Sequence, residues 1–308
     1  MRTVHQAGGS RMGNPIGTGS SSAQNLIFDV GLNVGQDTSF YLSQGYQVLA
    51  IEADPTLAEA VRKTFDHEIQ DGRLEVLNVG IAEKDGFADF WICEDKPEFS
   101  SFYRQIAARD SYSHHCIQIP VLRFASIIAR YGVPHYLKID IEGNDMSCLD
   151  GLSPSTAPKY LSVESECPLD EQSATVEDGV RTLQKLHSLG YRQFKLIDQY
   201  TFCSLTLPAT PGYRVDTLAR RIFNESFLKK IRGFGLISRH LIVKRRLETR
   251  FRWKFPHGSS GVWGEATPGK WISYGEAEQA YKHYRVRHFQ ASDSKFHSFW
   301  CDWHAKRD

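Results

Sequence analysis

Short apolar runs alternate with helical patterns from Leu26 onward, and this alternation constrains the fold more than any other feature of the sequence. Apolar runs of this length, bounded by turn residues, are typical of buried strands. The expected strands cover residues 26–30, 47–51, 74–79, 87–92, 117–122, 136–141, 160–163, 194–197 and 202–207. A helical pattern over residues 175–189 ends at Gly190, as helices often do. Strands that alternate with helices predict an α/β layer fold with a largely parallel sheet.

The chain divides into three parts by composition. Residues 1–25 show no apolar periodicity and are expected to be a flexible leader or an expression scar, while residues 26–208 carry the α/β pattern. Residues 214–254 hold 13 Lys and Arg residues against three acids, Asp216, Glu225 and Glu248, a local excess of ten positive charges. Five of the six tryptophans follow residue 250. We therefore expect residues 209–308 to form a basic helical and irregular subdomain that packs on the sheet domain or covers its mouth.

Three features are expected inside this last part. Apolar residues at helical spacing predict a helix over 218–231, residues 236–243 resemble a strand, and the turn-rich residues 261–275 are suited to a lid. The cluster from Lys244 to Lys254 can bind an anionic acceptor, a membrane surface or nucleic acid, although a solvated basic face is the simpler interpretation.

The overall composition limits the partners and the cellular location that the sequence allows. Lys and Arg total 37 and Asp and Glu total 36, so no global charge draws the chain to polyanions. No apolar run approaches the ~20 residues of a membrane-spanning helix, and no secretory leader is visible. The six cysteines form no C-x-x-C pair, which favours free thiols. We therefore expect a soluble, cytoplasmic protein.

The first predicted strand runs directly into a glycine turn, DVGLNVG, that starts at Asp29. Gly31 lets the backbone turn tightly beside a ligand, and Gly35 opens the next helix, whose free N–H groups attract acceptor groups. Glu52 ends the second strand 21 positions after Gly31. A carboxylate at this position can accept hydrogen bonds from both ribose hydroxyls. The pair of features predicts a nucleoside site, and the simpler alternative is an ordinary strand–helix turn.

The turn favours a nucleoside without a pyrophosphate. A dinucleotide fingerprint reads G-x-G-x-x-G, but Asn33 and Gln36 stand where its second and third glycines belong. S-adenosylmethionine suits the turn better, because Asp29 complements a cationic sulfonium and ammonium while Glu52 holds the ribose.

Four motifs together resemble the FkbM-type methyltransferases. They are IFDVGLNVGQDT from Ile27, IEADP from Ile51, NVGIAEKDG from Asn78 and LKIDIEGND from Leu137, and the resemblance covers about residues 26–207. It implies a class I methyltransferase fold, which is Rossmann-like with a mostly parallel seven-stranded sheet and helices on both faces. It also implies S-adenosylmethionine as methyl donor and, in most members, O-methylation of sugar or natural-product hydroxyls.

The resemblance also assigns residues. The donor-binding residues it implies are Asp29, Gly31, Asn33, Gly35, Glu52, Ala53, Gly80 and Ile81, the last two at the adenine. In one place the sequence departs from the family pattern: RFASI from Arg123 replaces the usual L-D-x-L.

Two acids lie at the carboxyl end of the sixth expected strand. Side chains alternate along a strand, so Lys138, Asp140 and Glu142 are expected on one face at its carboxyl end. We predict that Asp140 is the general base or a Mg²⁺ ligand and that Glu142 supports it. In the alternative interpretation Glu142 and Asp145 only favour the start of a helix that Asn144 caps. Nothing in the spacing requires a metal, so none is assigned.

Weaker candidates lie nearby. Glu164 and Glu166 follow the next strand, and the adjacent pair His114–His115 adjoins another. The sequence thus predicts an S-adenosylmethionine-dependent O-methyltransferase that acts on a sugar or small polar metabolite, with no obligate nucleic-acid partner. The alternatives are a nicotinamide-dependent oxidoreductase and a non-catalytic polyanion-binding protein.

Overall fold

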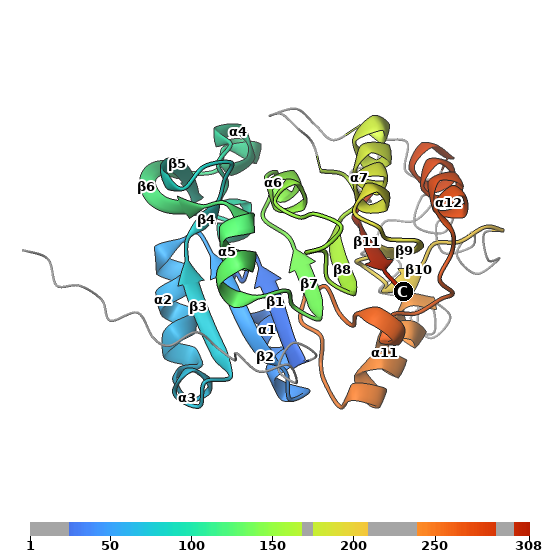
Figure 1. Ribbon diagram of the computed structural model, residues 1–308, viewed down its shortest axis with the longest axis horizontal. Coiled ribbons are helices and arrows are strands. Elements are labelled where there is room, and N and C mark those ends of the chain that lie inside the picture. Colours follow the sequence, from blue (N-terminus) through green and yellow to red (C-terminus); the bar gives the residue numbers. More distant parts are fainter. Residues whose placement is uncertain (1–24, 168–174, 209–238, 288–298) are drawn as a thin grey trace, which may run out of the picture.

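The computed structural model describes residues 25–167, 175–208, 239–287 and 299–308. A large sheet with helices on both faces occupies the centre, and a smaller sheet lies at the edge where the parallel strands end (Figure 1). The leader, apart from Asn25, and the helix expected over residues 218–231 fall outside the described residues.

Eight strands form the large sheet within the described parts of the chain, in the order β10-β9-β11-β8-β7-β1-β2-β3. Five neighbouring strands, β8 through β3 in this order, are parallel, while β11 is antiparallel to β8 and β9 and β10 is antiparallel to β9. The expected mostly parallel sheet is therefore present, with a short additional edge strand beyond the expected seven. The bounds are β1 Leu26–Val30, β2 Gln47–Glu52, β3 Leu74–Asn78, β7 Tyr136–Ile139, β8 Tyr160–Glu164, β9 Gln193–Asp198, β10 Cys203–Ser204 and β11 Cys301–Lys306.

The strand β11 comes from the C-terminal part of the chain and lies between β8 and β9. Its residue Asp302 stands opposite Glu164 of β8 and Ile197 of β9. Residues 301–306, from the C-terminal part of the chain, thus belong to the central sheet.

The strand expected over residues 236–243 is wrong for the part that the structure describes. Residues Arg239–Phe251 form helix α11. A short apolar run without wider context does not distinguish a strand from one side of a helix, and here helical packing decides the outcome.

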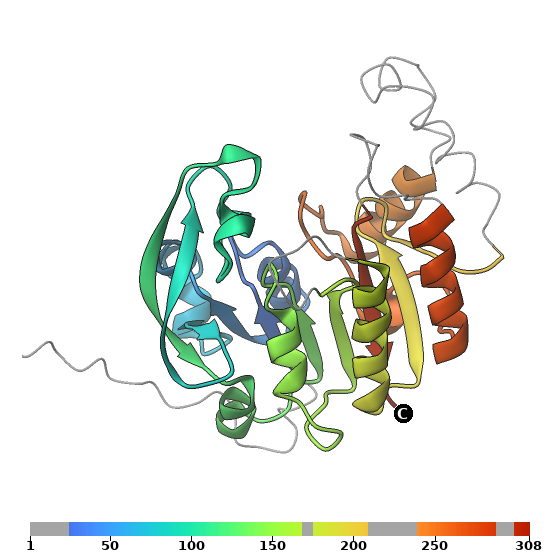
Figure 2. The same cartoon turned by 90° about the horizontal axis from the view of Figure 1, so that it is seen from above.

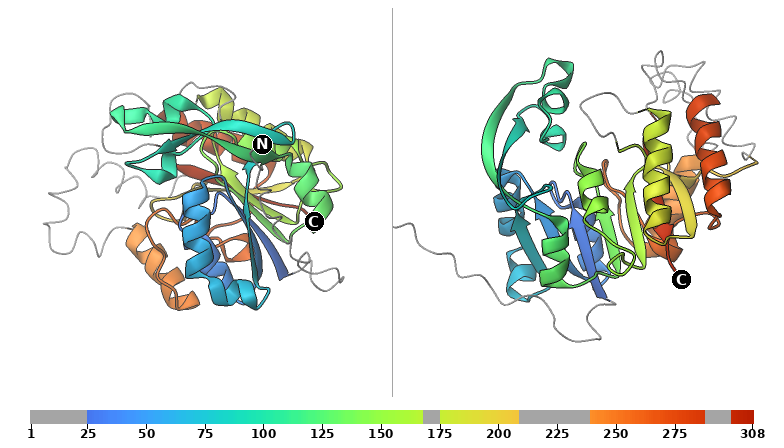
Figure 3. Two further views of the ribbon diagram at one scale, coloured as in Figure 1. Left: turned by 90° about the vertical axis from the view of Figure 1, so that its left-hand side faces the viewer. Right: turned by 45° about the horizontal axis from the view of Figure 1, so that its top comes forward.

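Alternate residues of the strands face two different cores. Phe28 and Val30 point to one side and belong to the core that includes Leu183 and Tyr281, whereas Ile27 points to the other side and belongs to the core that includes Phe40. Helices α7 and α12 lie side by side on the first face (Figure 2), and α11 lies on the opposite face with α1 and α2 (Figure 3). The helices are α1 Gln36–Ser43, α2 Pro55–Thr64, α3 Asp66–Gln70, α4 Arg104–Ala107, α5 Phe124–Tyr131, α6 Asp145–Asp150, α7 Val176–Ser188, α11 and α12 Tyr274–Arg287.

The two extended segments expected over 87–92 and 117–122 form a separate three-stranded sheet rather than part of the large one. Its strands are β4 Gly80–Ile81, β5 Gly86–Cys93 and β6 His114–Leu122, in the order β4-β6-β5. The connection between β5 and β6 contains α4 and leans over the carboxyl ends of the large sheet. The hydroxyl of Ser101 in this connection donates to the carbonyl oxygen of Glu142 at 2.7 Å, which ties the two sheets together.

Two general expectations can be compared with the structure. All six cysteines are free thiols, four of them buried. Among the described helices, none has the length and apolar character that crossing a membrane requires.

Candidate active site

A cavity of about 620 Å³ opens at the carboxyl ends of β1, β2, β7 and β8. This volume is typical of small-molecule sites, and parallel α/β sheets bind ligands at this edge. Of the residues assigned to the donor, Gly31, Asn33, Glu52, Ala53, Gly80 and Ile81 line the cavity, as do both predicted catalytic residues, Asp140 and Glu142. Asp29 and Gly35 are not among its lining residues.

The glycine turn after β1 passes against the end of β7. Gly31 has φ +88°, and a Cβ atom there would lie 1.7 Å from the carbonyl oxygen of Asp140. The amides of Gly31 and Leu32 both donate to the carbonyl oxygen of Ile51. Only glycine fits this position, because both the backbone conformation and the close approach exclude a side chain.

Glu52 faces the turn from the end of β2. One of its carboxylate oxygens accepts from the amide of Asn33 at 2.8 Å, and the other accepts from the amide of Asp54 at 2.9 Å. Burial raises the pKa of Glu52 to about 7, although these two amides oppose the shift. A carboxylate has about four acceptor positions, so two remain for the hydroxyls of a ligand.

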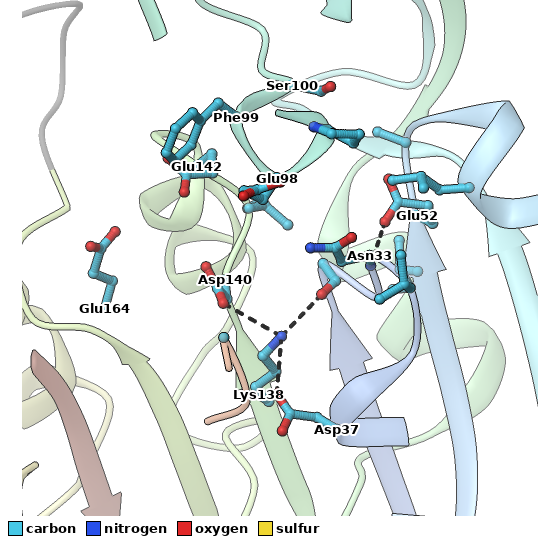
Figure 4. Close-up of a pocket in the computed structure, with 18 of the residues that line it drawn as sticks. Asn33, Asp37, Glu52, Glu98, Phe99, Ser100, Lys138, Asp140, Glu142 and Glu164 are labelled. Atoms are coloured by element: carbon cyan, nitrogen blue, oxygen red, sulfur yellow. Dashed lines mark hydrogen bonds and ion pairs between the residues drawn. The ribbon is translucent and has the colours of Figure 1, made fainter. Parts of the chain in front are cut away.

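Lys138 of β7 lies at the centre of the site. Its ammonium donates to the carbonyl oxygen of Gly31 at 3.0 Å and lies 3.3 Å from the carboxylate of Asp29. It also lies within 4 Å of the carboxylates of Asp37 and Asp140 (Figure 4). Burial opposes the charged form, but these carboxylates raise the pKa of Lys138 well above its ordinary value. Lys138 therefore stays charged and fixes the turn to β7.

Asp29 lies beneath the turn instead of facing the cavity. It is fully buried, and Thr38 donates to its carboxylate at 2.6 Å while Lys138 lies 3.3 Å away. In the register between β1 and β7, Asp29 stands opposite Lys138. The structure thus gives Asp29 an internal partner for its charge.

Asp140 and Glu142 take different directions after β7. Asp140 has a side chain that is 46% exposed, and it lies 3.6 Å from Lys138. Glu142 has φ 47° and accepts a hydrogen bond of 2.9 Å from Arg109, a residue of the smaller sheet's connection. The expected common face therefore holds for Lys138 and Asp140 only, because the backbone leaves the extended conformation at Glu142.

The start of α6 does not have the expected cap. Asn144 is the N-cap residue by position, but its side chain makes no capping hydrogen bond and donates instead to the carbonyl oxygen of Ile81. Asp145 accepts from the amide of Ile141. The segment therefore joins β4 to β7 and presents Glu142 to the cavity. Burial raises the pKa of Glu142 to about 7, although the positive charge of Arg109 lowers it.

The two acids expected beyond β8, Glu164 and Glu166, also lie in different places. Glu164 lines the cavity, and burial together with the neighbouring Glu142 raises its pKa well above the usual range. Glu166 does not line it and is bound by Arg285 at 2.5 Å and Tyr281 at 2.7 Å. Glu166 thus stabilises the packing of α12 and does not join the site.

Several cavity residues had no signal in the sequence. Tyr200, His257, Gly258, Phe299 and Trp300 come from the C-terminal half, and Glu98, Phe99 and Arg109 come from the connection of the smaller sheet. No residue of the segment 261–275, which was considered as a lid, lines the cavity, and Trp263 of this segment stacks on Tyr136 with ring centroids 4.6 Å apart.

The remaining candidates lie away from the cavity. His115 pairs with Glu94 at 2.8 Å, and neither histidine of the 114–115 pair lines the site. The basic residues Arg245, Arg246 and Arg250 surround a shallow surface hollow on α11. Across the described segments, no three His, Cys, Asp or Glu side chains are arranged to hold a metal ion.

A glycine turn and an acid at the ends of adjacent parallel strands face one cavity at the carboxyl edge of the sheet, an arrangement typical of α/β proteins that bind nucleosides. The Methyltransferase FkbM domain matches residues 29–193, more than half of the chain. The chain belongs to the FkbM methyltransferase family.

Solved structures and curated proteins add little to this assignment. The StiE O-MT domain is 10% identical with a TM-score of 0.37, and the match covers 94% of this chain and 70% of that one. PKMT2 from Rickettsia typhi is also 10% identical, with a TM-score of 0.25, over 91% of this chain and 37% of that one. Similarity this low carries no argument about function. The comparison with curated proteins found no significant match.

Proposed function

We propose that the protein is an S-adenosylmethionine-dependent O-methyltransferase that acts on a hydroxyl of a sugar or a similar small polar metabolite. The observation that carries the proposal is the juxtaposition of Gly31 and Glu52 at one end of the cavity, with the amide of Asn33 bound to the Glu52 carboxylate at 2.8 Å. This arrangement supports a ribose at Glu52 and the amino-acid part of the donor along the turn.

The neighbouring residues fit the rest of a nucleoside. Ala53, Gly80 and Ile81 line the same end of the cavity as Phe102. A Cβ atom at Gly80 would lie 2.5 Å from the Phe102 ring, so glycine is needed where the ring approaches the backbone. The result is an apolar slot for the adenine base, bounded by the acid that binds the ribose.

The proposed chemistry requires few groups. The bound donor supplies an electrophilic methyl group, and the protein aligns the acceptor oxygen with it. Asp140 has an accessible carboxylate at the centre of the cavity, and we assign it to take the proton of the acceptor hydroxyl. Glu142, held by Arg109, would help to orient the acceptor. The proposal does not require Mg²⁺ at these carboxylates.

Calorimetric titration with S-adenosylmethionine and, separately, with NAD and NADH tests the donor. We expect S-adenosylmethionine alone to bind, and a Glu52→Gln variant to bind it at least about tenfold more weakly, a loss of about 1.4 kcal/mol. Binding of NAD instead would favour an oxidoreductase. Methyl transfer from the labelled donor to a library of glycans and nucleotide sugars then tests the acceptor class. Asp140→Asn should keep donor affinity and lose turnover.

A further inference from the structure

The wall of the cavity beyond β8 is aromatic and comes from three separate segments. Trp300 precedes β11, Tyr200 follows β9, and His257 follows α11. The rings of Tyr200 and Trp300 meet edge to face with centroids 5.0 Å apart, and the centroids of His257 and Trp300 are 6.2 Å apart. A second ligand in the cavity would therefore meet aromatic faces on this side.

Carboxylates stand beside this aromatic wall. Glu164 lines the cavity at the end of β8, and Asp302 lies directly opposite it on β11. Asp302 is only 8% exposed, and its side chain has no hydrogen-bond or ion-pair partner within the described residues. Burial raises the pKa of Asp302 well above its usual range, and the next contribution comes from Asp140, which lines the cavity. A buried carboxylate without a donor indicates that a partner for it is missing.

The cations at the cavity are already engaged elsewhere. Within the described chain, the Lys and Arg residues that line it are Lys138 and Arg109. Lys138 is shared among three carboxylates, and Arg109 binds Glu142 at 2.9 Å and covers the Phe99 ring at 3.8 Å. The side chain of Glu164 has no ion-pair partner among the described residues, so a cation that enters this end of the cavity would meet an acidic group that no other side chain engages.

The proposed methyl donor does not fill this end. Its amino-acid part would lie along the turn that follows β1, and β8 is two strands away from β1. Neighbouring strands are about 4.8 Å apart, so the two places are about 10 Å apart. Figure 4 shows Glu52 and Glu164 on opposite sides of the cavity with Asp140 between them.

We propose that this end of the cavity, lined by Glu164, Trp300 and Tyr200 with the buried Asp302 opposite Glu164 on β11, binds a protonated amine on the acceptor, so that the methylated hydroxyl belongs to an amine-bearing molecule. The inference rests on the proposed O-methyltransferase function. Carboxylates supply charge to an ammonium group, and aromatic faces stabilise it by cation–π interaction. Asp140 then lies between the ammonium site and the proposed donor site, which is where an acceptor hydroxyl must be.

Three matched pairs of compounds test the proposal, each pair differing in an amine: glucosamine and glucose, serinol and glycerol, and tyramine and 4-ethylphenol. Affinity is measured by calorimetry with the protein saturated with S-adenosylhomocysteine, and methyl transfer is measured with labelled donor. We expect amines to bind at least about tenfold more tightly than their neutral partners. Glu164→Gln and Trp300→Leu should abolish this preference and leave donor affinity within about twofold.

Glu83→Gln is the matched control, because Glu83 is an exposed acid outside the cavity. It should retain the preference for amines. Equal affinity within the pairs, a preference for the neutral members, or no binding of any amine overturns the inference. Binding of Mg²⁺ that depends on Glu164 and excludes the amines also overturns it. If the wild-type protein fails to bind S-adenosylhomocysteine at all, the proposed function fails instead, and the two failures are thereby distinguished.

Discussion

The ammonium of Lys138 donates to the carbonyl oxygen of Gly31 at 3.0 Å, so a buried cation on β7 holds the turn that follows β1. The same ammonium lies 3.7 Å from Asp37, whose carboxylate accepts from Ser259 at 2.7 Å and from the amide of Ser260. One lysine therefore connects the glycine turn, the candidate base and the C-terminal loop. The integrity of the site depends on this charge.

Replacement of Lys138 by Met should destabilise the fold strongly. The variant leaves the carboxylates of Asp29, Asp37 and Asp140 without their shared cation, and loss of one partner of a buried ion pair costs about 3–5 kcal/mol. Urea unfolding measures the change. As a control, Lys282→Met removes a lysine that is 51% exposed and paired with Glu278, and it should leave the stability close to that of the wild type. Similar losses in the two variants would contradict the role given to Lys138.

Gly31→Ala and Gly45→Ala form a matched pair. Both glycines have positive φ, +88° and +86°, but an added Cβ atom meets the Asp140 carbonyl oxygen at Gly31 and nothing within 4 Å at Gly45. The backbone penalty of about 1–2 kcal/mol is common to both. We expect only Gly31→Ala to lose more than this in urea unfolding and to lose donor binding in calorimetry. Normal donor binding by Gly31→Ala would show that the turn tolerates displacement.

Glu52 should make stability depend on pH. Burial raises its pKa from 4.5 to about 7, so the folded protein holds this proton more tightly than the unfolded chain does. The stability contributed by Glu52 is therefore fully present below about pH 4.5 and is lost as pH rises through about 7. Denaturant unfolding across this range should show a steeper decline for the wild type than for Glu52→Gln. If the stability of the two proteins changed equally with pH, titration of Glu52 would not be the cause.

Donor affinity should change with pH in the opposite sense. Ribose hydroxyls donate to the charged form of Glu52, so binding of S-adenosylhomocysteine should tighten by up to about tenfold as pH rises from about 6 to 8. Calorimetry at several pH values checks this. The dependence should persist in Glu83→Gln and disappear in Glu52→Gln, and an unchanged slope in Glu52→Gln would assign it to another group.

Ser259→Ala should affect the acceptor more than the donor. The Ser259 hydroxyl donates to the buried carboxylate of Asp37 and fixes the loop that carries His257 and Gly258 to the cavity. Its loss should raise the KM for the acceptor severalfold and leave donor affinity unchanged. Ser155→Ala, at an exposed position on another loop, is the control. An equal loss of donor affinity would instead indicate that the loop supports the glycine turn.

The residues that the sequence assigned to the donor lie together for the most part because they are close in sequence or on neighbouring strands. Gly31, Asn33 and Glu52 lie within or beside two neighbouring strands, so strand order alone brings them together. The sequence did not predict that the side chain of Asp29 points away from the cavity, because its orientation depends on which face of β1 meets Lys138. The family assignment was predicted from the motifs and is confirmed by the domain match.

The acceptor end could not be predicted in this way. Trp300 reaches the cavity because β11 pairs between β8 and β9, and no local pattern encodes a pairing across more than a hundred residues. His257 lies in a loop that the contact between Ser259 and Asp37 holds, and these two residues are also distant in sequence. Residues 301–306 form a strand that is buried on both faces. The sequence did not predict this strand, because Asp302 and His304 interrupt the apolar pattern that a fully buried strand usually has. Helix α11 was mistaken for a strand because its apolar residues cluster at 241–243.

The central position of β11 also determines how a C-terminally truncated chain would behave. A chain that lacks residues 301–306 leaves β8 and β9 with facing rows of unpaired amides and carbonyls. Exposed strand edges of this kind recruit other chains. Truncation of so few residues would therefore produce insoluble material rather than a weakened enzyme, and intact polypeptide would be a condition for solubility as well as for catalysis.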